Sequence, residues 1–143
     1  MRRPAARVVC LADGLVLLLQ WRDPVGGAEF WEPPGGALED GEDWEEAARR
    51  ELFEETGLVA GELHGPVMVE RDFVWEGTRR VGPEAFFLAS WSATPEVRPE
   101  ADPALLAFAW VPAEEAASLG SVEPPELADV VRRLRARPSP PSR

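Results

Sequence analysis

Residues 36–58 constrain this chain most, because they combine the start and stop signals of a helix with an unusual cluster of acids. Asp43 is followed three residues later by Glu46, the spacing of a capping box at a helix start. Gly57 stands where a C-terminal cap is expected. These signals predict a helix over about 43–56.

Three glutamates of this helix fall on its apolar side. At about 100° per residue, the apolar stripe consists of Trp44, Ala47, Ala48 and Leu52. Glu51 and Glu55 lie inside the stripe, and Glu54 lies at its edge. A solvated acidic face is the usual interpretation of such a run, but here the solvated side is the opposite one.

Carboxylates on a half-buried face repel each other and lose hydration, so they need a compensating charge. Arg50, four residues before Glu54, can offset one of the three charges. A hard divalent cation such as Mg²⁺ would offset the others, because it prefers carboxylate oxygens and keeps waters that substrate phosphates can replace. The helix therefore indicates a metal site.

The sequence Pro33-Pro34-Gly35-Gly36 predicts a turn that leads directly into the helix. Its glycines allow a close approach of the backbone to a ligand. Such a turn could place a backbone carbonyl beside the carboxylates, although on its own the motif indicates only a plain turn.

This pattern resembles the Nudix box, G-x5-E-x7-R-E-U-x-E-E-x-G-U, in which U is Ile, Leu or Val. Every fixed position is matched, by Gly36, Glu42, Arg50, Glu51, Leu52, Glu54, Glu55, Gly57 and Leu58. In a chain of this composition a chance match is on the order of one in a million. The resemblance implies a Nudix hydrolase with an α/β fold: an α/β/α sandwich with a mixed sheet and a loop-helix-loop catalytic motif.

The resemblance also implies roles for single residues. It makes Glu51, Glu54 and Glu55 the metal-binding and catalytic carboxylates, with the carbonyl of Gly35 as a further ligand. Arg50 would belong to the catalytic set by orienting a glutamate through a charge-assisted bond. The expected cofactor is Mg²⁺, for which Mn²⁺ can substitute, and the expected reaction is hydrolysis of a diphosphate linkage in a nucleoside diphosphate-X substrate.

Other residues are weaker candidates. Glu100 and Glu84 are candidates for the general base or an extra ligand, although an ordinary surface glutamate is the commoner case for either. Four aromatic residues could stack on a base, and core packing is the alternative for each: Phe30, Trp31, Trp75 and Phe87. Four arginines could bind phosphate: Arg22, Arg71, Arg79 and Arg80. Of these two groups, Trp31, Trp75 and Arg22 are the predicted substrate contacts.

Residues that mark particular substrate classes lie beyond the box, and their absence narrows the choice of substrate by elimination. The proline typical of the ADP-ribose type and the tyrosine of the dinucleoside polyphosphate type are both missing, although Trp75 could replace the tyrosine. We therefore expect a nucleoside triphosphate pyrophosphohydrolase or a broad-specificity enzyme. The alternatives are a dinucleoside polyphosphate hydrolase, an ADP-ribose or nucleotide-sugar hydrolase, and a non-catalytic nucleotide sensor.

The amino-acid composition limits the binding partners and the cellular location that we expect. A net charge of -11 opposes binding of duplex nucleic acid. The single cysteine, Cys10, excludes an internal disulfide and favours a reducing cytoplasm. Asp13 interrupts the first apolar run, so neither a signal peptide nor a membrane span is expected. A homodimer is expected from the family resemblance alone.

The remaining pattern predicts one domain over residues 1–137 and a disordered tail over 138–143. Strands are predicted at 7–11, 15–21, 29–32, 67–69, 73–75, 85–90 and 107–111. A short helix is predicted from Pro112, and a last helix from Pro124 to about residue 137.

Overall fold

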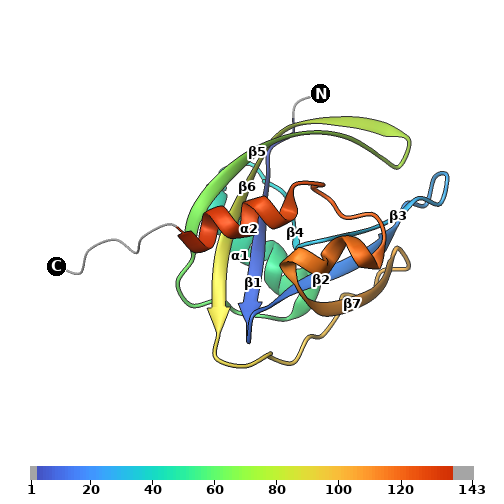
Figure 1. The fold of residues 1–143 in the computed structure, drawn as a ribbon. Helices are drawn as coiled ribbons and strands as arrows, with labels where there is room; N and C mark the ends of the chain where they lie inside the picture. Colours follow the sequence, from blue (N-terminus) through green and yellow to red (C-terminus); the bar gives the residue numbers. More distant parts are fainter. Residues whose placement is uncertain (1–2, 137–143) are drawn as a thin grey trace.

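A mixed sheet with a helix against each face forms the body of the protein (Figure 1). The computed structural model describes residues 3–136, so the predicted tail over 138–143 lies outside the described residues. The strands are β1 (Ala5–Ala12), β2 (Leu15–Arg22), β3 (Glu29–Glu32), β4 (Gly35–Ala37), β5 (His64–Trp75), β6 (Thr78–Trp91) and β7 (Leu105–Pro112). The helices are α1 (Trp44–Thr56), the 3₁₀ helix η1 (Ala113–Leu119) and α2 (Leu127–Ala136).

Strand β1 is the centre of the sheet. It runs parallel to β6 and antiparallel to β2 and β4. The main strand order is β3-β2-β1-β6-β5, with β4 paired to β1 and β7 paired to β2. One parallel pair among antiparallel pairs makes the sheet mixed, which confirms the predicted α/β fold.

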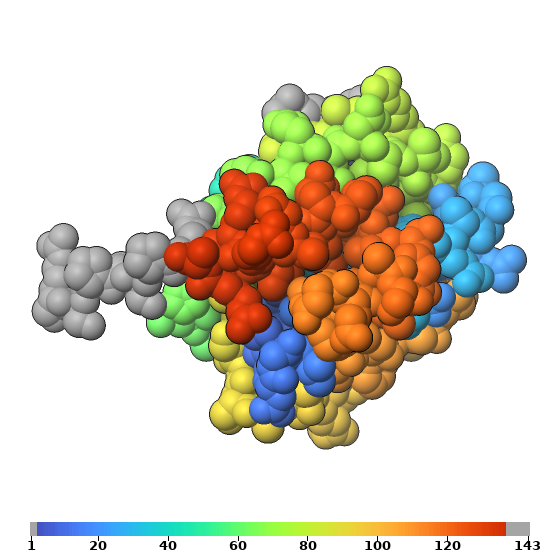
Figure 2. All heavy atoms as spheres, viewed as in Figure 1, coloured from blue at the N-terminus to red at the C-terminus, as the bar shows by residue number. Residues whose placement is uncertain are grey.

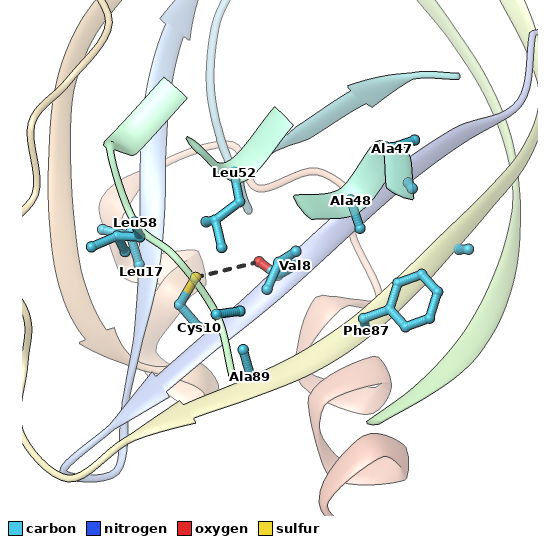
Figure 3. Close-up of a cluster of buried hydrophobic side chains, with 12 residues drawn as sticks. Val8, Cys10, Leu17, Ala47, Ala48, Leu52, Leu58, Phe87 and Ala89 are labelled. Atoms are coloured by element: carbon cyan, nitrogen blue, oxygen red, sulfur yellow. Dashed lines mark hydrogen bonds between the residues drawn. The ribbon is translucent and has the colours of Figure 1, made fainter. Parts of the chain in front are cut away.

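Helix α1 covers one face of the sheet through its predicted apolar stripe. Ala47, Ala48 and Leu52 are fully buried and pack in a cluster with Val8 and Cys10 of β1 (Figure 3). The Cys10 thiol donates a hydrogen bond to the Val8 carbonyl at 3.8 Å, and burial raises the pKa of the thiol. Cys10 is therefore a core residue.

Helix α2 covers the opposite face. Val130, Val131 and Leu134 of α2 pack with Val9 of β1 and Phe86 of β6. In the space-filling view, α2 and η1 hide most of the sheet behind them (Figure 2). Because successive residues of a strand point to opposite faces, β1 contributes to both apolar clusters. Among residues 3–136, no helix has the length and apolar character needed to cross a membrane.

Both ends of α1 have the predicted caps. Asp43 is the N-cap, and its side chain accepts a hydrogen bond from the backbone N–H of Glu46 at 2.8 Å. The Glu46 side chain accepts from the N–H of Asp43 at 3.1 Å, which completes the capping box. Gly57 closes the helix with φ 74°, in the left-handed region that favours glycine.

One local prediction was wrong. Residues 35–37 form strand β4 against β1 instead of a turn that enters the helix, and residues 38–43 connect β4 to α1. The pairing partner that decides this case is about thirty residues away in the sequence. The strand-like stretches predicted at 67–69 and 73–75 both lie in the longer strand β5, which pairs with β6 in a hairpin. The last helix begins at Leu127, three residues after Pro124.

Truncation of Leu52 tests the packing of α1 on the sheet. Leu52→Ala removes a fully buried side chain and should lower the free energy of unfolding by about 2–5 kcal/mol. The adjacent Phe53 is 58% exposed, so Phe53→Ala should change it by only about 0.5 kcal/mol. Urea denaturation of both variants measures the difference, and equal losses would contradict the assigned face.

Candidate active site

A pocket of about 470 Å³ opens beside α1, on the side of the sheet where β4 joins β1. Four carboxylates from α1 and the loop before β7 line one part of it: Glu51, Glu54, Glu55 and Glu100. Four aromatic rings from β2, β3 and β5 line another part: Trp21, Phe30, Phe73 and Trp75. The pocket therefore joins an acidic region to an aromatic one.

The three helix glutamates differ in burial and partners. Glu55 is buried, and its Oε1 accepts a hydrogen bond from the Gly35 N–H at 2.8 Å. Glu51 is partly buried, and its Oε1 accepts from Nη1 of Arg50 at 3.0 Å. Glu54 is exposed and accepts from the same nitrogen at 3.2 Å. The structure thus brings together the three carboxylates that the sequence singled out.

Arg50 connects the helix to the preceding loop. Its guanidinium donates to both carboxylate oxygens of Glu42, with Nε–Oε2 at 2.6 Å and Nη2–Oε1 at 2.9 Å. It also donates to the Ala37 carbonyl at 3.0 Å. The hydrogen bond with Arg50 lowers the pKa of Glu42 to about 2. Arg50 thus holds the carboxylates and the 37–42 segment in fixed relation.

The buried acids carry raised pKa values. Burial raises the pKa of Glu55 well above its ordinary value, and the Gly35 N–H opposes this shift only in part. Burial also raises the pKa of Glu51, against the effect of Arg50. The pKa of Glu100 is raised by burial, by Asp102 and by the nearby Glu51. A bound cation would favour the charged forms of all these groups.

The acidic region matches a divalent cation in its chemistry. It offers carboxylate oxygens, the ligands that Mg²⁺ and Mn²⁺ prefer. Within residues 3–136, no three His, Cys, Asp or Glu side chains converge closely enough to hold an ion as they stand. Glu51 and Glu54 instead share Nη1 of Arg50. Both side chains would have to leave Arg50 before they could bind a cation.

Gly35 and Gly36 allow strand β4 to pack closely between β1 and α1. A Cβ on Gly35, whose φ is 155°, would lie 2.3 Å from the Ala6 carbonyl oxygen. A Cβ on Gly36 would lie 2.7 Å from Cδ of Glu51. Real Cβ atoms do not come this close to other atoms, so only glycine lets β4 lie directly against the Glu51 carboxylate.

A buried ion network lies along the pocket wall. Arg7 donates to Glu84 at 2.9 Å and pairs with Glu32 at 3.2 Å. Arg71 donates to Glu84 at 3.2 Å and to Glu123 at 2.5 Å. Glu84 is 2% exposed and lies between two arginines, which argues against its predicted role as a general base. Burial raises the pKa of Glu32 to about 7, against the opposing effect of Arg7.

Of the predicted substrate contacts, only Trp75 lines the pocket. The Trp31 side chain alternates with that of the pocket-lining Phe30, so it points to the other face of the sheet and packs among the apolar residues near α2. Arg22 is exposed beside Gly27 and does not line the pocket either. Phe87 belongs to the cluster under α1.

The sequence analysis missed Arg7 and Trp21, which both line the pocket. Arg7 lies in an apolar strand and is 6% exposed. A charged residue in such a strand is a signal for a buried partner. Trp21 ends the apolar run of β2 and gave no signal of its own. Arg80, one of the four arginines considered for phosphate, also lines the pocket.

Comparisons with known proteins agree with this geometry. Residues 1–134 match the family model described as NUDIX domain. "Nudix hydrolase 25" of Arabidopsis thaliana is 51% identical over 57 residues, which cover 38% of this chain and 31% of that protein. "Phosphatase NudJ" of Escherichia coli K12 is 39% identical over 66 residues, which cover 45% and 42%. The chain thus spans less than half the length of these curated relatives.

Among solved structures, the solution structure of the E. coli ORF135 protein superimposes with a TM-score of 0.71 at 25% identity. The match covers 97% of this chain and 95% of that one. The similarity therefore extends over the whole described fold, including α1 and the strands around the pocket.

Alanine at Gly36 tests the close approach of β4 to Glu51. Gly36→Ala should displace the Glu51 carboxylate, whose side chain can rotate, and lower Mn²⁺ affinity by about 10–100-fold with little loss of stability. Gly61→Ala is the matched control, because nothing lies within 4 Å of its added Cβ. Calorimetric titration with Mn²⁺ measures both variants, and equal affinities would show that the contact has no influence on cation binding.

Proposed function

The chain belongs to the NUDIX domain family, and we propose that it is a metal-dependent hydrolase of a diphosphate linkage in a nucleoside diphosphate-X substrate. We propose a nucleoside triphosphate as the first choice of substrate. The protein would then be a nucleoside triphosphate pyrophosphohydrolase or an enzyme of broad specificity. The names of the curated relatives, a Nudix hydrolase and a phosphatase, support a hydrolytic reaction.

One observation carries this proposal: three glutamates from one stretch of α1 line the same pocket as a group of aromatic rings. Carboxylates that can bind a cation suit the diphosphate, and aromatic rings suit a base. A nucleotide needs both regions at once. A purely structural acidic helix would leave the aromatic part of the pocket unexplained.

The proposed roles follow from the contacts. Glu51, Glu54 and Glu55 would hold Mg²⁺ or Mn²⁺, together with the Gly35 carbonyl. When bound, the cation would supply charge neutralisation on the phosphate oxygens and acidify water. Arg50 contacts Glu51 and Glu54 through its Nη1. Its proposed role is to hold these carboxylates in the pocket until a cation takes them over.

We propose Glu100 as the general base or an extra ligand. It lines the pocket, and its backbone N–H donates to the Glu55 carbonyl at 3.0 Å, which ties the 95–103 loop to the end of α1. Burial and nearby acids raise its pKa, which moves a carboxylate toward the range useful for proton transfer. The other candidate, Glu84, already accepts from two arginines.

The position of Trp75 favours a second substrate class. It lies in the pocket where a second base could stack, so a dinucleoside polyphosphate is the next candidate, ahead of ADP-ribose or a nucleotide sugar. A nucleotide sensor without turnover is the remaining alternative. We place the protein in the cytoplasm, because Cys10 is a buried free thiol, and expect a homodimer, which size-exclusion chromatography with light scattering would reveal.

A substrate panel with Mg²⁺ and Mn²⁺ tests the reaction. It contains nucleoside triphosphates, dinucleoside polyphosphates, ADP-ribose and nucleotide sugars. Glu54→Gln should lower the rate of nucleoside phosphate product formation, measured by anion-exchange chromatography, by on the order of 100-fold or more, because it removes a metal-binding charge. Glu45→Gln is the matched control: both glutamate side chains are 52% exposed and both pair with an arginine four residues away.

Loss of turnover in Glu54→Gln alone would support the assignment, and equal turnover in the two variants would remove Glu54 from the site. Binding of a nucleotide without turnover on the whole panel would move the protein to the sensor alternative.

Thermal unfolding tests cation binding without any substrate. A cation that binds only the folded state at ten times its dissociation constant should raise Tm by about 3–5 °C. The rise should be smaller in Glu54→Gln, because one ligand is lost. Differential scanning calorimetry with and without Mg²⁺ measures the shift, and an identical Tm at millimolar Mg²⁺ would contradict cation binding by these glutamates.

A further inference from the structure

Two buried nitrogen atoms point to a ligand beyond the acidic region. Among the buried side-chain nitrogen and oxygen atoms of residues 3–136, only Trp21 Nε1 and Arg80 Nε lack a hydrogen-bond partner. Both residues line the pocket. Trp21 is 7% exposed, so its N–H is shielded from water as well as unpaired. An unpaired buried donor is unfavourable, and a ligand in the pocket is the partner that would satisfy it.

The surroundings of these donors suit a flat aromatic group. Trp21 and Phe30 lie opposite each other on the paired strands β2 and β3. The Trp75 ring meets both edge-on, at centroid distances of 6.4 Å from Trp21 and 5.7 Å from Phe30. Arg80 pairs with Phe73 across β5 and β6 on the same wall. A planar ring that displaces these edge contacts can stack on a freed aromatic face.

Most other arginines of this region already have partners. Arg7, Arg50 and Arg71 are each held by two or more carboxylates. Arg3 and Arg80 both line the pocket and form none of the ion pairs found among the described residues, but Arg3 is exposed to water and only Arg80 has a buried nitrogen without a partner.

We propose that Trp21 and Arg80 read the base of the substrate and select bases that carry a carbonyl group over bases that carry an amino group at the same position. Both unpaired atoms are donors, so a carbonyl oxygen satisfies them, whereas an amino group would place donor against donor. The inference rests on the proposed function, because it names the nucleotide class that the same pocket takes. Arginine is a frequent partner of carbonyl-bearing bases for the same reason.

One carboxylate near the aromatic region would instead favour bases that carry an amino group. Glu76 lines the pocket and could accept from an amino group. Its backbone N–H donates to both oxygens of the buried Asp23 at 3.1 Å, which fixes its position at the end of β5. The Glu76 side chain is exposed to water, so we expect it to contribute less selectivity than the two shielded donors.

Matched nucleotide pairs test the proposal. ITP and ATP differ in a carbonyl against an amino group on a purine, and UTP and CTP differ in the same way on a pyrimidine. The ratio of kcat/KM within each pair should favour the carbonyl member by on the order of tenfold in the unmodified protein. Trp21→Phe keeps an aromatic ring and Arg80→Met keeps an unbranched apolar stem, but each removes the donor, so each should bring the ratio toward one. Trp91→Phe removes an indole N–H outside the pocket and should leave the ratio unchanged.

A ratio near one, a preference for the amino members, or a ratio unchanged in both Trp21→Phe and Arg80→Met would overturn the proposal. A failure of the proposed function gives a different result, namely no hydrolysis of any nucleotide. In that case calorimetric binding of IMP and AMP measures the same selectivity without turnover. Tighter binding of IMP that is lost in both variants would still support base reading, and equal binding would contradict it.

Discussion

The cluster of acids around one guanidinium is the constraint on which this site depends. Arg50 lies within 3.5 Å of oxygens from four carboxylates, those of Glu39, Glu42, Glu51 and Glu54. One positive charge cannot balance four negative ones, and burial makes the imbalance more costly for Glu51. Glu42 binds the Arg50 guanidinium most closely, because it accepts two hydrogen bonds from it. The other carboxylates share the remaining capacity of Arg50, and we propose that a cation supplies the positive charge that they still lack.

A second ion network lies along the pocket wall, next to the aromatic region. Glu84 lies between Arg7 and Arg71 and is almost completely buried. Removing one member of such a network would leave an uncompensated buried charge, which is costly. Arg7 also donates to the Pro33 carbonyl and so fixes the chain just before β4. The network thus positions Gly35 and Gly36 against α1, and the two regions of the pocket keep their relation to each other.

The sequence predicted what is local and missed what depends on remote partners. Helix α1, both of its caps and its buried stripe were correct, because these signals lie within about fifteen residues. Strand β4 was mistaken for a turn, because its pairing with β1 joins residues some thirty apart. Trp31 was assigned to the pocket, but a strand alternates its faces and the sequence does not say which face is the core. The Arg7–Glu84 pair spans 77 residues, so the charge of Arg7 in an apolar strand signals a buried partner but does not identify Glu84.

The central claim is that the α1 glutamates bind a divalent cation in the pocket. Anomalous diffraction from crystals grown with Mn²⁺ locates such an ion directly. We predict a manganese peak within coordination distance of oxygens from at least two of Glu51, Glu54 and Glu55, with Glu51 and Glu54 rotated away from Arg50. A peak elsewhere in the molecule, or no peak in the pocket at saturating Mn²⁺, would contradict the claim.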